Sequence, residues 1–195
     1  PRHAALPAGE EDAVMKACRA VLAVNDMNET LRHVTHPVLP PPGIAVTMIE
    51  GYEKDNVVPG NVRLLLDFRI HPGMDHEQVG RFLDKGFEQA GIDGCQRTLR
   101  YYMPGGEIRQ DDRFVKLCLE ERERLLGIKS FPQPFEASCE QCFLTEQGIR
   151  TVICGPGDIA QAHTVGEFTR EKQVRDAVKL YGRIIDRILY KTKYN

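Results

Sequence analysis

The chain has 195 residues, of which 42% are hydrophobic and 28% charged, and this composition is typical of a globular protein with an ordinary core. Its formal net charge of -2 offers no basic excess for nucleic acid, so we expect a small-molecule or protein partner. No apolar run approaches the roughly 20 residues of a membrane span, and no secretory signal opens the chain, so we expect a cytoplasmic protein without a membrane partner.

The first predicted elements are a helix, two strands and a second helix. The strands are expected at Ile44–Tyr52 and Asn61–Ile70, which are rich in β-branched residues and leucine and have turn signals around them. The second helix is expected at Met74–Gly91, where it ends at a glycine. The first is expected at Glu10–Met27, with an apolar face of Val14, Ala17, Cys18, Val21 and Leu22.

A third strand is predicted at Gln96–Met103, where apolar and polar residues alternate. The order helix, strand, strand, helix, strand lacks only the opening strand of a two-helix, four-stranded antiparallel layer. We expect that strand to precede Pro1. Because the chain also begins without methionine, we expect it to be a fragment.

A domain boundary is predicted at Pro104–Asp112, where glycine and charged residues interrupt the pattern. Beyond it we predict a helix at Arg113–Leu126, a buried strand at Arg150–Gly155 and a final helix from about Glu171 to Leu189. This alternation indicates an α/β layer whose other strands lie outside the chain. The final helix should pack on a sheet through Val174, Val178, Tyr181, Ile184, Ile185 and Ile188.

His163 is the first candidate for chemistry. It follows the predicted strand through a Gly-Pro-Gly turn, and Glu167 lies four residues later. Histidine is a common metal ligand and titrates near neutral pH, and loops at strand ends hold ligands in α/β proteins. The alternative is a loop histidine bonded to a backbone carbonyl, and the turn alone does not distinguish the two.

Three further candidates lie before the boundary. Asn56 occupies a turn-prone loop before a strand, and Arg69 lies near the far end of that strand. Arg69 either holds a carboxylate through two parallel hydrogen bonds or faces outward and pairs with Asp67, and spacing favours neither. His3, in the short segment before the first helix, would ordinarily be an exposed side chain without a role.

The cysteines indicate reduced thiols rather than a disulfide framework. Cys139 and Cys142 form a single C-x-x-C, and a structural zinc site would need a second pair or two histidines at suitable spacing. We interpret them as incidental thiols and keep a redox role as an alternative. The six cysteines are Cys18, Cys95, Cys118, Cys139, Cys142 and Cys154.

Three motifs occur in order along the chain. They are HAALP, beginning at His3; GYEKDNVVPGNVRLLLDFR, Gly51–Arg69; and TVICGPGDIAQAHTVGEF, Thr151–Phe168. Together they resemble the dinuclear zinc amidohydrolases that include acetylornithine deacetylase, succinyl-diaminopimelate desuccinylase, aminoacylase and the carboxypeptidase G type. The resemblance covers essentially the whole chain and is nearest the acetylornithine deacetylase and desuccinylase branch.

The resemblance implies roles for individual residues. It makes His163 the last protein ligand of a two-zinc site and Arg69 a clamp for the substrate carboxylate. It makes His3 and Asn56 lid residues that reach the active site of the partner subunit, where His3 steadies the oxyanion of the tetrahedral intermediate.

A further resemblance concerns residues 138–140. Glu140 matches the carboxylate of the family's T-E-A or T-S-D segment, and Ser138 and Cys139 lie where its hydroxyl-bearing residues would be. These positions imply contacts with the substrate. Cysteine at position 139 replaces the usual small hydroxyl residue.

The resemblance implies a fold with two parts. Residues 1–104 would be an α+β lid and dimerisation domain with two helices on an antiparallel sheet, and residues 105–195 the C-terminal part of an α/β zinc-hydrolase domain. The family's H-x-D and E-E metal motifs are not found in this chain. The pairs Glu10–Glu11 and Glu120–Glu121 are instead expected on solvated helix surfaces.

The implied activity is hydrolysis of the amide bond of N-acyl amino acids by a homodimer. Each complete active site would hold two zinc ions, with cobalt or manganese as alternatives, and the isolated chain would be inactive. The alternatives are a dipeptidase or aminopeptidase of the same architecture, and a non-catalytic dimerisation module.

Overall fold

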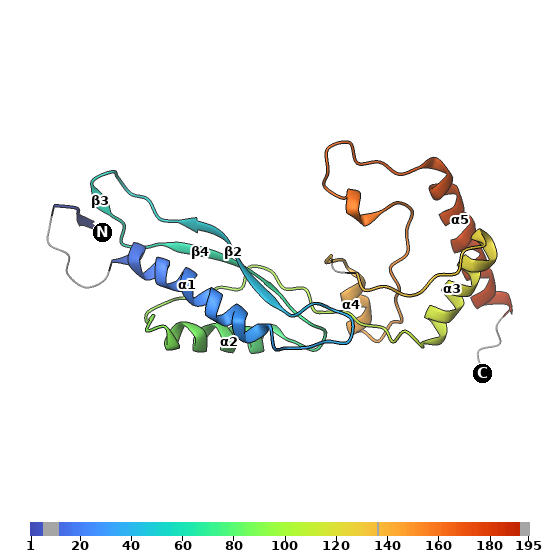
Figure 1. Cartoon of the computed structure of the whole chain (residues 1–195), viewed down its shortest axis with the longest axis horizontal. Helices are drawn as coiled ribbons and strands as arrows, with labels where there is room; N and C mark the ends of the chain where they lie inside the picture. The colour runs from blue at the N-terminus through green and yellow to red at the C-terminus, as the bar shows by residue number, and fades with distance from the viewer. Residues whose placement is uncertain (6–11, 136, 192–195) are drawn as a thin grey trace. The chain divides into compact units, whose positions relative to one another are not determined.

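The computed structural model describes residues 1–5, 12–135 and 137–191. It divides into two compact units, Pro1–Gly105 and Gly106–Asn195, each described separately below (Figure 1). The Glu10–Glu11 pair and the end of the HAALP motif lie outside the described residues.

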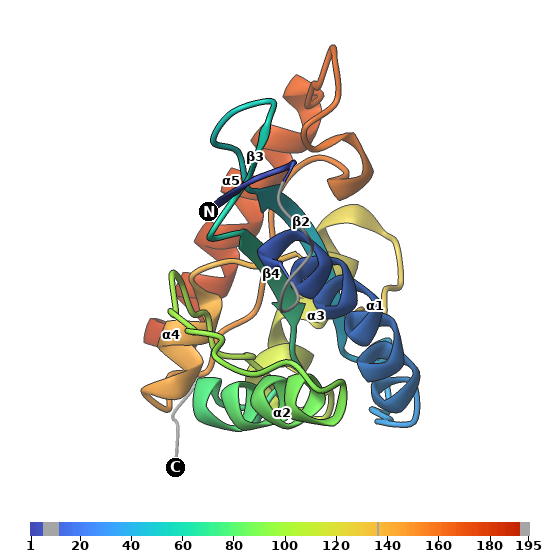
Figure 2. The ribbon, with the colours of Figure 1, turned by 90° about the vertical axis from the view of Figure 1, so that its left-hand side faces the viewer.

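The first unit is built on two helices and a two-stranded antiparallel sheet. The sheet joins β2 (Gly43–Glu50) to β4 (Arg63–Arg69), with Ile44 opposite Phe68 and a bulge between Val46 and Met48. Helices α1 (Ala13–Leu31) and α2 (His76–Gln89) cover one face of this sheet (Figure 2). Both predicted strands and both predicted helices are confirmed, with ends shifted by a few residues.

The ends of the helices follow from capping residues. The side chain of Asp12 accepts a hydrogen bond from the Met15 amide at 2.9 Å, and Asp75 forms a reciprocal capping box with Gln78. After α2, Gly91 adopts a φ of 66°, a left-handed conformation that glycine tolerates best. Local chemistry therefore fixes where these helices start and stop.

The core of the first unit lies between the sheet and the helices. The predicted face of α1 was partly wrong, because Val14, Cys18 and Leu22 are exposed. The helix packs through an alanine-rich side instead, since small residues allow its backbone to approach its neighbours. The buried cluster is Ala20, Ala23, Val24, Met27, Leu31, Ile44, Leu83 and Ile92.

The predicted strand at Gln96–Met103 was wrong, because these residues form no strand. A strand is held by ladder hydrogen bonds to a neighbour. Among the described residues no strand pairs with this segment, so its alternating pattern alone does not produce one.

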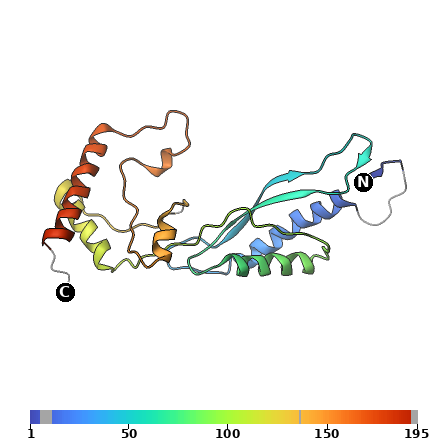
Figure 3. The same ribbon diagram turned by 180° about the vertical axis from the view of Figure 1, so that it is seen from behind.

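The second unit is helical where it is regular. It contains α3 (Arg113–Leu126), α4 (Gln141–Glu146), the 3₁₀ turn η1 (Ile159–Gln161) and α5 (Glu171–Asp186), which continues as the π-helical turn η2 (Arg187–Lys191). Helices α3 and α5 lie side by side (Figure 3). The predicted helices at α3 and α5 are confirmed, and α4 was not predicted.

Two predictions for this unit were wrong. Residues 150–155 form no strand, and α5 packs on α3 rather than on a sheet. Both errors have one physical reason, because a buried parallel strand needs neighbours on each side and the described part of this unit contains no strand. Much of the predicted stripe of α5 is consequently exposed, including Val174, Val178 and Ile185.

A buried carboxylate joins the two long helices of the second unit. Glu121 on α3 is only 4% exposed, and it accepts hydrogen bonds from Arg183 at 3.0 Å and Arg187 at 2.8 Å. Burial raises the pKa of Glu121, but these hydrogen bonds and the nearby Arg124 charge outweigh burial and lower it overall. The expectation that Glu121 lies on a solvated surface was therefore wrong, whereas Glu120 is exposed as expected.

Candidate functional site

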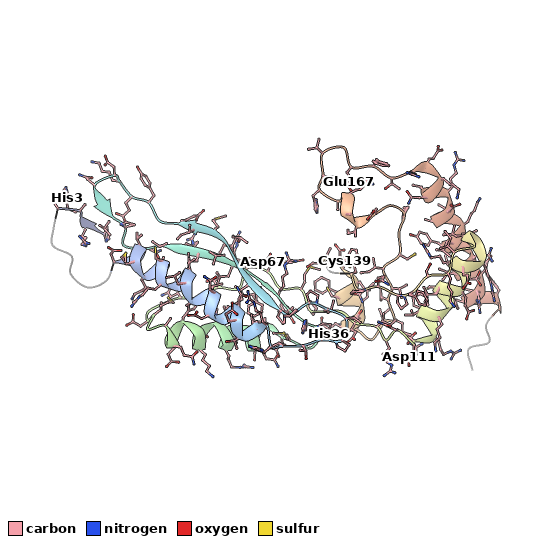
Figure 4. The ribbon with its side chains drawn as sticks, in the orientation of Figure 1. His3, His36, Asp67, Asp111, Cys139 and Glu167 are labelled. Atoms are coloured by element: carbon pink, nitrogen blue, oxygen red, sulfur yellow. The ribbon has the colours of Figure 1, made fainter. Side chains whose placement is uncertain are left out.

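The structure brings His3 and Asn56 together. A second small sheet pairs β1 (Arg2–His3) with β3 (Val57–Val58), and His3 lies opposite Val57. The side chains of His3 and Asn56 approach to 3.2 Å between Nε2 and Nδ2, and the Ala4 amide donates to the Asn56 carbonyl at 2.9 Å. Two residues 53 positions apart thus form one exposed polar pair. Figure 4 labels His3.

This small sheet is built by the loop between β2 and β4. The amide of Val57 donates to the Lys54 carbonyl at 3.0 Å, which closes a tight turn ahead of β3. Gly60 lies very close to Pro1. A β-carbon added at residue 60 would lie only 2.5 Å from the Pro1 nitrogen and would overlap it. Arg2 also forms an ion pair of 3.6 Å with Asp12, the cap of α1. The first residues of the chain are therefore held against the loop that carries Asn56.

Arg69 lies at the end of β4 farther from the loop that carries Asn56, roughly 20 Å along the strand from Arg63 at 3.3 Å per residue. Its guanidinium pairs with Asp67 through two contacts, Nε–Oδ1 at 2.9 Å and Nη2–Oδ2 at 3.1 Å. The Arg69 side chain is 64% exposed. Of the two arrangements that the sequence left open, the structure contains the outward-facing pair.

Ser138, Cys139 and Glu140 precede α4. Ser138 and Glu140 are exposed, and Glu140 stands at the N-cap of α4 without a capping side-chain hydrogen bond. The buried Cys142 thiol donates to the Cys139 carbonyl at 3.1 Å, and both cysteines are reduced. The two polar side chains therefore face solvent next to a short helix.

His163 occupies a strained position in the loop before α5. Its φ is 63°, and it is the only described residue other than glycine with a positive φ. Its amide donates to Glu167 Oε2 at 3.1 Å, which ties the loop to the carboxylate four residues later. Glu167 is labelled in Figure 4. Such strain is found preferentially at functional sites, where the surrounding structure holds the residue in place.

A metal site is not formed by the described residues. They contain no group of three or more histidine, cysteine, aspartate or glutamate side chains that could hold a metal ion. His163 therefore lacks further ligands within the described part of the chain, and a single imidazole does not make a zinc site.

The sequence interpretation missed two polar contacts that organise these positions. Glu167 was noted only for its spacing, yet it binds the His163 amide. Glu121 was assigned to a solvated face, although the repeated Glu and Arg spacing of residues 120–124 was a signal for a charge network.

In the same unit, burial raises the pKa of Cys118 to about 11, so this thiol is not a reactive thiolate at neutral pH.

Comparisons with known proteins identify relatives for most of the chain. Residues 1–94 match the family model of the M20 peptidase dimerisation domain. The acetylornithine deacetylase of Myxococcus xanthus is 27% identical over 175 residues, which cover 85% of this chain and 44% of that enzyme. The N-acetyl-L-citrulline deacetylase of Xanthomonas campestris pv. campestris is 27% identical over 163 residues, covering 83% of this chain and 43% of that enzyme.

A solved structure supports the fold. The M20 family metallo-carboxypeptidase of Sulfolobus solfataricus matches with a TM-score of 0.61 at 19% sequence identity, over 93% of this chain and 46% of that protein. The chain thus spans slightly less than half the length of the relatives it matches. No helix among residues 1–5, 12–135 and 137–191 is long and apolar enough to cross a membrane.

Proposed function

Since this chain belongs to the M20 family of peptidases and deacetylases, we propose that it takes part in metal-dependent hydrolysis of the amide bond of N-acyl amino acids. In this proposal residues 1–104 are the lid and dimerisation domain, and residues 105–195 are the C-terminal part of the catalytic domain. The remaining half of the relatives' length would supply the rest of the active site, and the isolated chain is inactive.

The pairing of His3 with Asn56 is the observation that carries the proposal. It lies within the region matched to the peptidase dimerisation domain, and it presents an exposed imidazole on β1, beside the loop that carries Asn56, rather than in a core. An imidazole N–H is suited to stabilising the negative oxygen that develops when an amide carbonyl is attacked. In a homodimer formed through residues 1–104, His3 and Asn56 would act at the partner's active site.

Arg69 would select substrates with a free carboxylate. Its present partner Asp67 is 42% exposed, and an exposed ion pair contributes only about 0–1 kcal/mol. A substrate carboxylate with the same two-oxygen geometry can therefore replace Asp67 at small cost. Ser138 and Glu140, both exposed ahead of α4, complete the set of proposed substrate contacts.

The metal is proposed from the family, and His163 is its one candidate ligand in this chain. The described residues do not fit a zinc site by themselves, because they hold no cluster of ligands. Two zinc ions per complete site, or cobalt or manganese in their place, would need further ligands from outside the described residues. No chemical step is therefore assigned to the metal.

The test uses the natural protein that carries this chain, purified from its source with an antibody against residues 1–195. We expect it to hydrolyse N-acetylornithine or N-succinyl-diaminopimelate and to lose this activity when a chelator removes the metal. Hydrolysis of dipeptides with a free amine, but not of acyl amino acids, would identify a dipeptidase or aminopeptidase instead. A stable dimer with no hydrolysis and no metal would identify a non-catalytic dimerisation module.

A variant tests the substrate clamp. In the same protein, Arg69→Ala should raise the KM for an acyl amino acid about tenfold or more, since a charge-assisted hydrogen-bond pair is lost. Arg63→Ala is the matched control, because Arg63 lies on the same strand, is 78% exposed and pairs only loosely with Glu50 at 3.9 Å. Equal effects of the two variants would refute the role of Arg69.

A further inference from the structure

The tautomer of the neutral His3 ring follows from its contacts with two neighbours. The Ala5 backbone amide lies 3.1 Å from Nδ1 and can only donate a hydrogen bond. A neutral imidazole has one nitrogen that accepts and one that carries the proton. Nδ1 must therefore be the acceptor, and the proton is on Nε2.

This assignment fixes the orientation of the Asn56 amide. An N–H on Nε2 cannot face the NH₂ group of Asn56 across 3.2 Å, because both groups would be donors. A backbone amide cannot reverse its role, whereas a side-chain amide can turn by 180° and exchange its oxygen for its nitrogen. The Asn56 oxygen then accepts a hydrogen bond from the Nε2–H group.

The backbone holds both partners in place. The Asn56 carbonyl accepts from the Ala4 amide, and β1 pairs with β3 immediately beside both residues. The Ala4 amide thus holds the loop that carries Asn56, and the next amide, that of Ala5, holds the His3 ring. Neither contact depends on a residue outside this hairpin and the first five positions.

We propose that the Ala5 amide and the Asn56 side chain position His3 as a hydrogen-bond donor through Nε2. The Ala5 amide selects the tautomer, and Asn56 is a positioning residue that orients the ring. Its oxygen accepts the hydrogen bond from Nε2–H until a negatively charged oxygen takes that place. The use of this donor in catalysis rests on the proposed function, whereas the tautomer and its cause do not.

The tautomer is measurable in the 195-residue chain by long-range ¹H–¹⁵N correlations of the histidine rings, at a pH where they are neutral. His3→Gln identifies the His3 signals, and the exposed His33 ring is an internal reference. We expect the Nδ1–H form of His3 to be about tenfold less populated than that of His33, as one hydrogen bond provides. Equal populations in the two rings, or a predominant Nδ1–H form in His3, would overturn the proposal.

Variants separate the two contacts. Asn56→Asp should keep the Nε2–H form, because a carboxylate can only accept, whereas Ala5→Pro removes the donor and should bring the tautomer ratio to that of His33. Asn61→Ala is the matched control and should leave the tautomer ratio of His3 unchanged, since Asn61 is an exposed asparagine five residues after Asn56. A shift of His3 from the Nδ1–H toward the Nε2–H form in Asn56→Asp would mean that Asn56 donates to Nε2 in the unmodified chain. That result would overturn the proposal even if Ala5→Pro fails to fold.

These outcomes are distinct from failure of the proposed function. If the natural protein hydrolyses no acyl amino acid but His3 shows the Nε2–H form with the expected response to Ala5→Pro, the positioning stands and the catalytic role falls. If hydrolysis is found but His3 does not show the Nε2–H tautomer, only the positioning of His3 is refuted and the proposed function stands.

Discussion

Backbone strain at His163 distinguishes it from the other proposed site residues. The left-handed conformation costs a residue with a side chain roughly 1–2 kcal/mol, and a glycine would avoid that cost. The hydrogen bond from its amide to Glu167 uses only the backbone of residue 163, so it does not require histidine. The imidazole at this strained position therefore calls for a functional explanation, and ligation of a metal is the one proposed.

We predict that His163→Gly makes the chain more stable, by about 0.5–1 kcal/mol after the entropic cost of glycine is subtracted. His163→Ala is the matched control, because it removes the imidazole but keeps the strain and should bring no gain. Urea unfolding of the three chains measures both effects. Equal stability of the glycine and alanine variants would show that strain at this position is negligible.

Glu121 gives the second unit an acid-sensitive contact. The pKa of Glu121 is lowered in the folded chain, so the unfolded chain binds more protons at acidic pH. The ionised carboxylate therefore stabilises the fold above the ordinary pKa of 4.5, and this stabilisation is lost as the pH falls below that value. We predict that Glu121→Gln lowers the free energy of unfolding by about 2 kcal/mol at neutral pH and flattens this acid dependence. Urea titrations across pH 3–7 test this. Glu123→Gln, an exposed change on the same helix, should leave both quantities unchanged.

At the scale of single residues, the sequence identified candidates better than their partners. Asp67 could be named as a partner of Arg69 because the two lie two positions apart on one strand, where side chains share a face. The contact between His3 and Asn56 could not be derived from spacing, because it depends on how the loop between β2 and β4 folds back on the first residues. Long-range contacts of this kind are determined by tertiary structure.

Among the elements, helices were predicted well and strands only where a partner strand is present. Helices such as α2 carry their own signals, with an Asp75 cap at one end and Gly91 at the other. The strands β2 and β4 pair with each other, but Gln96–Met103 and Arg150–Gly155 have no partner among the described residues. Hydrophobic patterning therefore indicates which segments tend to be extended, whereas backbone hydrogen bonds to a neighbouring strand decide whether a strand forms.

Replacing each of two helical glycines by alanine should change stability in opposite directions. A β-carbon at Gly86 on α2 would lie 2.7 Å from Met27 Cγ on α1, so Gly86→Ala should destabilise the chain by about 1–2 kcal/mol despite the better helix propensity of alanine. Gly182 on α5 has no atom within 4 Å of the corresponding position, so Gly182→Ala should stabilise by up to about 1 kcal/mol. Thermal unfolding of both variants measures the difference. A stabilising Gly86→Ala would mean that α1 and α2 are not closely packed.

On the scale of the whole molecule, three findings point the same way. The region matched to the Myxococcus xanthus deacetylase covers 85% of this chain but only 44% of that enzyme. The described residues also contain no group of side chains that could hold a metal ion. The exposed apolar stripe of α5, with Val178 at 66% exposure, also lacks a partner element in the described second unit. All three are expected if this chain functions together with the portion of the relatives that it does not match.

Native mass spectrometry of the natural protein tests this account most directly, because one spectrum gives chain mass, oligomeric state and metal content. We predict a dimer whose subunits are heavier than the 22.1 kDa of this chain, or associated with a complementary chain, and carry about two zinc or equivalent metal ions each. A metal-free monomer of 22.1 kDa with no associated second chain would contradict it.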